Sequence, residues 1–138
     1  MNDRNARNQR ITDEFRANDG KVGGRYEGRP ILLLHDIGAR SGLNRVHPLA
    51  YLPVGDSFAI FASKGGGPMN PDWYHNLIAN PDVSVEVGTE TISVKARVAQ
   101  DEERERIWTR QKELYPNFAQ YEKLTTRQIP VIILERVS

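Results

Sequence analysis

Residues 83–98 read VSVEVGTETISVKARV. Apolar and polar residues alternate from Val83 to Val87 and again from Thr91 to Val98, and a period of two is typical of a strand with one buried face. Gly88 lies between the two runs, where a tight turn is needed. The stretch therefore predicts a β-hairpin.

A second hairpin is predicted around the dipeptide Gly55-Asp56. The run Val46–Leu52 leads into this turn, and the apolar run Ser57–Ser63 leaves it. Two further strands are expected at Ile31–Leu34, which is wholly apolar, and at Val131–Glu135. Strands that follow one another through tight turns pair in the antiparallel sense, so the sheet should be largely antiparallel.

Four helical segments are expected around these strands. In the first, Ile11 and Phe15 lie one helical turn apart. The second begins with Asn70 as its N-cap and Pro71 at its first helical position, and Asp101 caps the third. The segments are residues 1–19, 70–79, 102–114 and 116–126.

The predicted order of elements, α-β-β-β-α-β-β-α-α-β, indicates a mainly β chain with added helices, an α+β protein. Six short, largely antiparallel strands with a few helices suggest a small barrel with the helices packed outside. The 138 residues fit one domain, residues 1–138. The glycines at 65–67 lack the spacing of a dinucleotide-binding turn, so a Rossmann domain is excluded.

The composition argues against several classes of protein. Lys and Arg number 19 and Asp and Glu 18, whereas a nucleic-acid binder of this size usually has a large basic excess. The absence of cysteine rules out disulfides, thiolate metal sites and a cysteine nucleophile. No apolar run approaches the roughly 18 residues of a membrane span, and residues 1–10 lack the apolar core of a signal peptide. We expect a soluble cytoplasmic protein with no nucleic-acid partner.

One candidate site is a group of cations around the turn at residues 38–42. Arg40-Ser41 and Arg45 lie in and just after the turn at residues 38–42, and Lys64 ends the third predicted strand. In the hairpin arrangement these segments approach one another. Three cations, a hydroxyl and glycine N–H groups make an anion site, although each could equally be a solvated surface charge.

Two further groups involve aromatic side chains. The first turn of the helix after Asn70 suits a phosphate, and Trp73 and Asn76 share one face of it, although Trp73 could simply belong to the core. Tyr115, Phe118 and Tyr121, spaced at three, form either core packing or one wall of a cavity for a flat ligand. The three histidines show no metal-ligand spacing, so no metal is expected, and no serine is tied to a histidine as a hydrolase triad requires.

Four stretches taken together resemble the deazaflavin (F420)-dependent nitroreductase family of actinobacteria. They are Lys21-Val22-Gly23-Gly24; Gly38–Gly42 followed by Arg45 and Pro48; Ala62–Gly66; and Pro71–Leu77 with Ala79-Asn80-Pro81. Their order, spacing and composition match over nearly the whole chain. The resemblance implies a split β-barrel like the FMN-binding fold, usually dimeric.

The same resemblance implies coenzyme F420, an 8-hydroxy-5-deazaflavin with a phosphate and an oligoglutamate tail held by basic residues. The positions that it assigns to coenzyme contact are Ala39, Arg40, Ser41, Arg45, Val46, His47, Pro48, Leu49, Ala50, Tyr51, Phe61, Ala62, Ser63, Lys64, Asp72, Trp73, Tyr74, His75, Asn76 and Phe118.

The resemblance also implies a reductase that passes a hydride from C5 of F420H2 to an electron-poor acceptor: an enone, an unsaturated lactone, a quinone or a nitro compound. Ser63, Tyr115 and Tyr121 are the candidate catalytic residues, with Ser63 placed to hydrogen-bond near the reacting ring or to polarise the substrate. Phe118 stands where the best-known nitroreductase of the family has a tyrosine, and the missing hydroxyl bears on nitroimidazole reduction.

Other functions remain open from the sequence. An FMN-dependent enzyme of the same fold would need fewer basic residues, because FMN ends in one phosphate. A non-catalytic protein that stores F420 would bind it without oxidising the reduced form. The arginines at positions 4, 7, 10 and 16 give slight support to weak membrane association through the N-terminus, which could also be a lid or a disordered tail.

Overall fold

The computed structural model describes residues 3–137, and the strands within this range form one sheet in the order β2-β1-β5-β6-β7-β4-β3. Every neighbouring pair runs antiparallel, which confirms the expected sheet type. The strands are β1 (Ile31–Ile37), β2 (Asn44–Ala50), β3 (Leu52–Val54), β4 (Ser57–Phe61), β5 (Asp82–Val87), β6 (Glu90–Val98) and β7 (Val131–Arg136).

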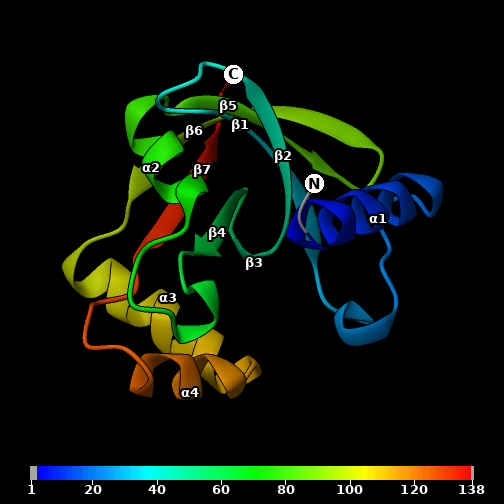
Figure 1. Ribbon diagram of the computed structural model, residues 1–138. Helices are drawn as coiled ribbons and strands as arrows, with labels where there is room; N and C mark the ends of the chain where they lie inside the picture. Colours follow the sequence, from blue (N-terminus) through cyan, green and yellow to red (C-terminus); the bar gives the residue numbers. More distant parts are fainter. Residues whose placement is uncertain (1–2, 138) are drawn as a thin grey trace.

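The sheet curls until its two edges approach each other (Figure 1). β2 and β3 are the edge strands, yet only Tyr51 separates them in the chain. A flat sheet of this size would hold its edges roughly 30 Å apart, at about 4.8 Å per strand, whereas one residue spans only a few ångströms. The sheet must therefore fold back on itself, and because β2 and β3 do not pair, the barrel stays open between them.

The break at Tyr51 corrects the prediction of a single strand over Val46–Leu52. β2 pairs back onto β1, with Ala50 opposite Ile31, whereas Leu52 pairs with Ala59 of β4. The Tyr51 N–H donates instead to the carbonyl of Pro30 at 3.1 Å. The chain thus leaves one edge of the barrel and joins the other, so the described residues contain seven strands rather than six.

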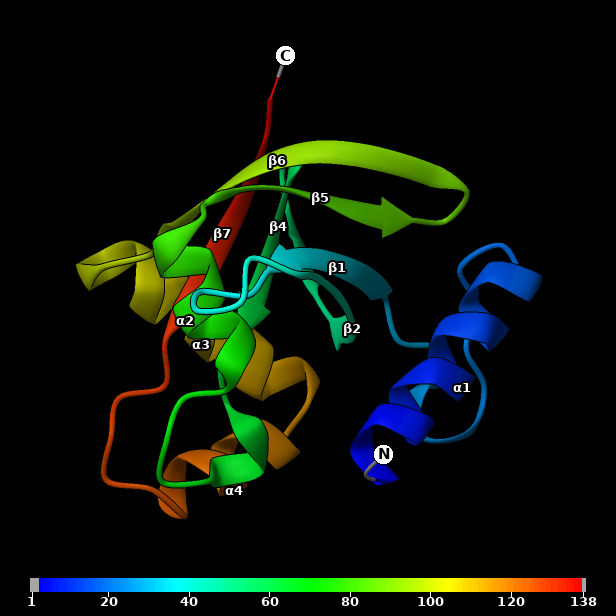
Figure 2. The ribbon, with the colours of Figure 1, turned by 45° about the horizontal axis from the view of Figure 1, so that its top comes forward.

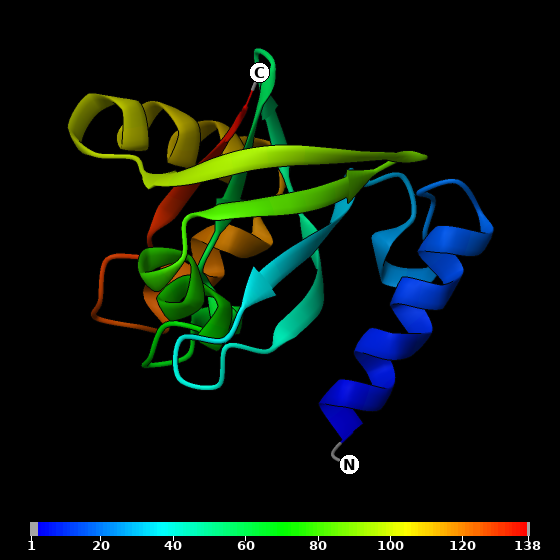
Figure 3. The ribbon, with the colours of Figure 1, turned by 90° about the horizontal axis from the view of Figure 1, so that it is seen from above.

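Helices lie on two sides of the barrel. α1 (Asp3–Ala17) lies apart from α2 (Asp72–Ala79), α3 (Asp101–Leu114) and α4 (Asn117–Lys123), as Figures 2 and 3 show. The prediction of outer helices is confirmed. Within residues 3–137, no helix is both long enough and apolar enough to cross a membrane.

The start of α2 differs from the prediction. The helix begins at Asp72, with Pro71 in extended conformation at the cap and no side-chain capping bond. Asn70, the expected N-cap, accepts a hydrogen bond from Arg127 Nη1 at 2.7 Å instead. A charged donor outcompetes a backbone N–H for the amide oxygen, because charge-assisted bonds are stronger.

The apolar run of β1 is buried on both faces. Leu32 and Leu34 belong to the barrel interior, whereas Ile31 and Leu33 pack under α1 against Phe15. A third cluster, built around Trp108 and Ile133, joins α3 and α4 to the outer face of β4 and β7. The hairpin of β5 and β6 forms as predicted, with Val85 opposite Ile92.

A cluster of charges fastens α1 to the barrel. Arg16 Nη2 donates to Glu86 Oε2 of β5 at 2.7 Å, and His35 Nε2 of β1 lies 2.6 Å from the same oxygen. The hydrogen bond from Arg16 is the main reason that the pKa of Glu86 lies below its ordinary value of 4.5, and burial opposes it.

This cluster makes stability depend on pH. A carboxyl group with a lower pKa in the folded state stabilises the protein above its unfolded pKa, and the contribution disappears as the pH falls through the folded value. We therefore expect the wild-type protein to lose stability more steeply than Glu86→Gln below about pH 4.5. Urea unfolding at a series of pH values measures the difference, and parallel curves would contradict it.

Candidate active site

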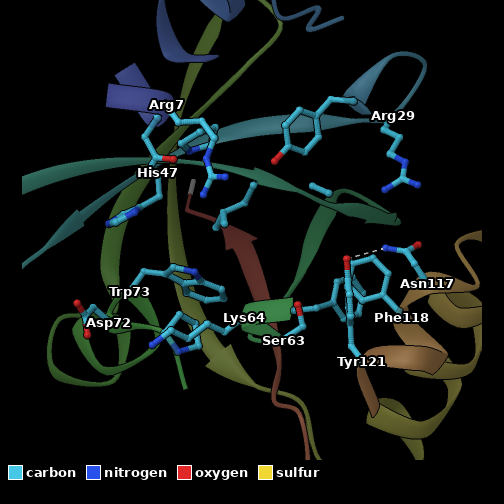
Figure 4. A pocket seen from close by; sticks show the side chains of 17 residues that line it. Arg7, Arg29, His47, Ser63, Lys64, Asp72, Trp73, Asn117, Phe118 and Tyr121 are labelled. Carbon is cyan, nitrogen blue, oxygen red and sulfur yellow. Dashed lines mark hydrogen bonds between the residues drawn. The ribbon is translucent and has the colours of Figure 1, made fainter. Parts of the chain in front are cut away.

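A pocket of about 450 Å³ opens where β2, the end of β4 and three of the helices meet (Figure 4). The sequence-predicted residues on its wall are His47, Pro48, Leu49, Ala50, Phe61, Ser63, Lys64, Asp72, Trp73, Phe118 and Tyr121. Those outside it are Ala39, Arg40, Ser41, Arg45, Val46, Tyr51, Ala62, Tyr74, His75, Asn76 and Tyr115.

One wall is the loop that follows β4. Ser63 is almost buried, and Lys64 is exposed with a φ of 49°, in the left-handed region. The short 3-10 turn at Lys64–Gly66 packs closely on α4: a Cβ on Gly66 would lie only 2.9 Å from the carbonyl oxygen of Tyr121. Glycine at this position lets the lysine and α4 line the same pocket.

Arg127 holds this loop in place, and sequence reasoning missed it. Its guanidinium group donates to the carbonyls of Ser63 (2.9 Å) and Gly67 (3.1 Å), and to Asn70 Oδ1. All three acceptors are neutral, and burial lowers the pKa of Arg127. The partners lie 57 to 64 residues away, so no local pattern indicates them.

A second wall is the first turn of α2. Trp73 is 6% exposed and belongs both to the barrel interior and to the pocket wall. Asp72 lies beside it on the pocket wall. Tyr74 is half-buried and His75 is exposed, both outside the pocket.

Asn76 is buried and lies outside the pocket. Its Nδ2 donates to Asp36 Oδ2 at 2.6 Å, and its Oδ1 accepts from the Ala39 N–H at 2.9 Å. Asp36 is fully buried, and its Oδ1 lies 3.2 Å from His47 Nε2, within ion-pair distance but without hydrogen-bond geometry. The amide thus ties α2 to the turn at residues 38–42 and stabilises a buried carboxylate.

The predicted cation group is only partly gathered. Lys64 lines the pocket, whereas Arg40, Ser41 and Arg45 are exposed on the turn after β1 and at the start of β2. This turn lies alongside α2 in Figures 2 and 3 and is bonded to it through Asn76. The arginines therefore lie outside the pocket, near the turn that Asn76 ties to α2.

The three predicted aromatic residues of α4 and its approach are also only partly gathered at the pocket. Phe118 packs against Phe61 with ring centroids 5.8 Å apart, and both line the pocket. The Tyr121 hydroxyl accepts a hydrogen bond from Asn117 Nδ2 at 3.0 Å, at the pocket wall. Tyr115 lies outside, beneath the guanidinium group of Arg29, which is 4.8 Å from its ring centroid.

Several lining residues come from segments that sequence reasoning did not assign to the site. Arg7 and Asn8 project from α1, and Tyr26 and Arg29 come from the segment before β1. With Lys64, the two arginines give the wall three cations against one carboxylate, that of Asp72. In the described part of the chain, no three His, Asp or Glu side chains gather in a way that could hold a metal ion.

Comparisons with known proteins identify the relatives of this chain. A family model for F420H2-dependent quinone reductases matches residues 7–136. The chain belongs to this family. An F420H2-dependent quinone reductase of Mycobacterium tuberculosis H37Rv is 42% identical over 126 residues, which cover 88% of this chain and 85% of that protein. The resemblance expected from the four motifs is confirmed.

Two solved structures are similar to this member of the F420H2-dependent quinone reductase family. One, an F420H2-dependent reductase, is 44% identical with a TM-score of 0.71 and covers 78% of this chain and 95% of its own. The other, described as a domain-swapped dimer, is 40% identical with a TM-score of 0.72 and covers 95% and 96%. The chain is an F420-dependent oxidoreductase, and its curled open sheet is a split β-barrel.

The residues present fit the coenzyme of the F420H2-dependent quinone reductases. Its deazaflavin ring is flat and partly apolar, and the pocket offers Trp73, Phe61 and Phe118. Its tail carries a phosphate and several carboxylates, and Lys64 on the pocket wall is a cationic side chain of the kind that suits such anions. The aromatic and cationic side chains of the pocket therefore suit the coenzyme that this family uses.

Proposed function

We propose that the chain transfers a hydride from reduced F420 to an electron-poor acceptor, with quinones as the main acceptor class. The observation that supports this most directly is the pocket itself, in which Ser63, Lys64 and Trp73 of the family motifs meet the aromatic side chains of α4. When bound, reduced F420 supplies the hydride at its ring C5. The enones, lactones and nitro compounds remain alternative acceptors.

The side chains of the pocket do the positioning. Trp73, Phe61 and Phe118 offer flat apolar surfaces that would hold the ring and exclude water. Ser63, at the end of β4, has a hydroxyl group that can donate to an oxygen of the acceptor or the ring. Hydride transfer needs close alignment of the donor and acceptor atoms more than it needs acid–base groups, which agrees with the aromatic wall of this pocket.

The coenzyme tail has a natural path out of the pocket. Lys64 stands at the wall, whereas Arg40 and Ser41 on the turn that Asn76 ties to α2, and Arg45 at the start of β2, lie outside the pocket. A tail that leaves past Lys64 and crosses the first turn of α2 would meet these cations in succession. The predicted anion site is thus proposed as the tail site, with the ring in the pocket.

Fluorescence quenching of oxidised F420 tests this arrangement. We expect Lys64→Ala and Arg45→Ala each to weaken binding by about 1–3 kcal/mol, the usual range for a charge-assisted contact. Lys95→Ala, which removes an exposed cation on β6 away from the pocket, is the matched control. Unchanged affinity in both site variants would mean that the groove lies elsewhere, and equal affinity for FMN would favour the FMN-dependent alternative.

Arg127 provides a second test, because it acts through the loop. Arg127→Met keeps an apolar stem but removes the donors to Ser63, Gly67 and Asn70. We expect about tenfold weaker F420 binding, with an urea-unfolding stability lowered by about 1–3 kcal/mol. Arg110→Met, on the exposed face of α3, should change neither quantity; a variant that loses stability but binds F420 normally would show that the loop keeps its shape without the clamp.

The reductase assay decides between the enzyme and a storage protein. Oxidation of F420H2 is followed by its absorbance with a panel of quinones, enones and nitro compounds. Tight binding without turnover of any acceptor would favour a storage role, and turnover of nitro compounds or enones alone would exclude quinones as the main class. Ser63→Ala should lower turnover with every acceptor if its hydroxyl lies near the reacting atoms.

A homodimer is also proposed. It is supported by the solved relative described as a domain-swapped dimer, which is 40% identical and covers 95% of this chain. Sedimentation equilibrium of the purified protein measures the mass directly, and a single species of 15.7 kDa would contradict the dimer.

A further inference from the structure

Two arginines on the pocket wall have no role in the tail site. Arg7 projects from α1 and Arg29 from the segment before β1, and Figure 4 shows both side chains reaching into the pocket from the side that faces Ser63, Lys64 and Trp73. The two residues lie 22 positions apart in the sequence. The fold therefore brings both residues to the wall of one pocket.

Among the side chains that the structure describes, none forms a carboxylate ion pair with either guanidinium group. Arg16, Arg97 and Arg104 all form ion pairs with glutamates, but no ion pair of Arg7 or Arg29 is present among the described residues. Arg29 instead stacks on the ring of Tyr115 at 4.8 Å, which restrains the plane of its guanidinium group. An arginine restrained in this way, with a second arginine on the wall of the same pocket, suits a ligand with oxygen atoms.

The chemistry of the proposed reaction supplies such oxygens. Hydride transfer breaks a C–H bond at C5 of the reduced coenzyme and places the electron pair on the quinone, which becomes a hydroquinone monoanion. After the hydride has left, the oxidised coenzyme releases one proton, and the hydroquinone monoanion takes up one proton to become the neutral hydroquinone. Negative charge thus develops on an acceptor oxygen, and cations already in position stabilise that charge more than the neutral quinone.

We propose that Arg7 and Arg29 form an oxyanion subsite for the acceptor, opposite the wall that carries Lys64. The subsite rests on the proposed function, since it assigns the acceptor to this side of the pocket and the coenzyme to the other. It binds acceptors that already carry an ionised oxygen beside the reducible ring more tightly than neutral acceptors of the same shape.

A pair of naphthoquinones of similar size tests the subsite. At neutral pH, 2-hydroxy-1,4-naphthoquinone is an anion, whereas 2-methyl-1,4-naphthoquinone is neutral. In Arg7→Gln and in Arg29→Gln, we expect KM for the anionic quinone to rise about tenfold more than KM for the neutral one, the loss typical of a charge-assisted contact. Arg10→Gln, on an exposed position of the same helix, should leave the ratio unchanged.

The affinity for oxidised F420 shows whether the two arginines bind the acceptor or the coenzyme. The Kd for oxidised F420 should change by less than about twofold in both variants, because the coenzyme tail lies elsewhere. If F420 binding weakens about tenfold while the KM ratio stays constant, the arginines hold the coenzyme and the subsite is wrong. If neither quantity changes, the arginines bind no anion at all, which also overturns it.

Failure of the proposed function would look different. Binding of the anionic quinone to the F420-loaded protein is measured by quenching of tryptophan fluorescence, with no turnover required. If none of the acceptors tested supports oxidation of F420H2 by the wild-type protein, the reductase proposal fails. The binding measurement still decides whether the subsite exists. Loss of quinone binding in both variants, with Arg10→Gln unaffected, supports the subsite; binding equal to that of the wild type refutes it.

Discussion

Replacing Trp108 with alanine is expected to lower the free energy of unfolding by about 3–5 kcal/mol, the usual cost of emptying a buried tryptophan site. The Trp108 side chain is 1% exposed, and its ring lies 5.8 Å from that of Phe61 and 6.1 Å from that of Phe118. Its indole N–H donates to Glu122 Oε2 at 2.5 Å. Alanine would remove both the packing and the donor.

The same substitution should damage the pocket, because Trp108 supports Phe61 and Phe118 from behind. Urea unfolding followed by circular dichroism gives the stability, and F420 fluorescence quenching gives the binding. Trp108→Phe, which keeps a ring but loses the N–H, should cost less, and Leu114→Ala on an exposed position of α3 should stay within about 0.5 kcal/mol of the wild type. A loss below about 1 kcal/mol for Trp108→Ala would contradict the packing described.

Trp108→Phe has an additional readout. The hydrogen bond from the indole N–H is the main reason that the pKa of Glu122 lies below its ordinary value. In Trp108→Phe this pKa should move back upward, by an amount that NMR titration of the carboxyl group can follow. A Glu122 pKa unchanged in this variant would mean that the indole does not hold the carboxylate in solution.

Asn76→Ala is expected to cost about 3 kcal/mol of stability, the upper end of the range for taking a hydrogen-bond partner from a buried polar group. The carboxylate of Asp36 is fully buried and would lose the 2.6 Å hydrogen bond from the amide. The Ala39 N–H would lose its acceptor as well. The turn that carries Arg40 and Arg45 would no longer be fixed to α2, so F420 binding should weaken even though Asn76 does not line the pocket.

Two variants check this explanation by urea unfolding. His75→Ala changes the exposed neighbour on α2 and should be nearly neutral. Asp36→Asn in the Asn76→Ala background should recover part of the loss, because a neutral amide is cheaper to bury than a carboxylate. If Asn76→Ala behaves like His75→Ala, or if Asp36→Asn deepens the loss, the buried carboxylate is not what Asn76 stabilises.

Asn76 also shows where the motifs of the sequence stop being informative. Its place in the Pro71–Leu77 stretch helped to identify the family, and the family is confirmed. Its position on a helix face three residues from Trp73 suggested a ligand contact, whereas the side chain turns inward to Asp36, 40 residues away. A motif records that a residue type is required at a position, but not which neighbour requires it.

The strands, the hairpin at residues 83–98 and the coenzyme family follow from alternation, turn residues and four short motifs, all of which are local in the chain. Three features do not: the passage of the chain from one barrel edge to the other at Tyr51, the clamp by Arg127 on a loop about 60 residues earlier, and the entry of Arg7 and Arg29 into the pocket. Alternation identifies a strand because neighbouring side chains point to opposite faces of it. Pairing partners and pocket walls depend instead on how far the sheet curls, and that is set by contacts between residues that no local pattern relates.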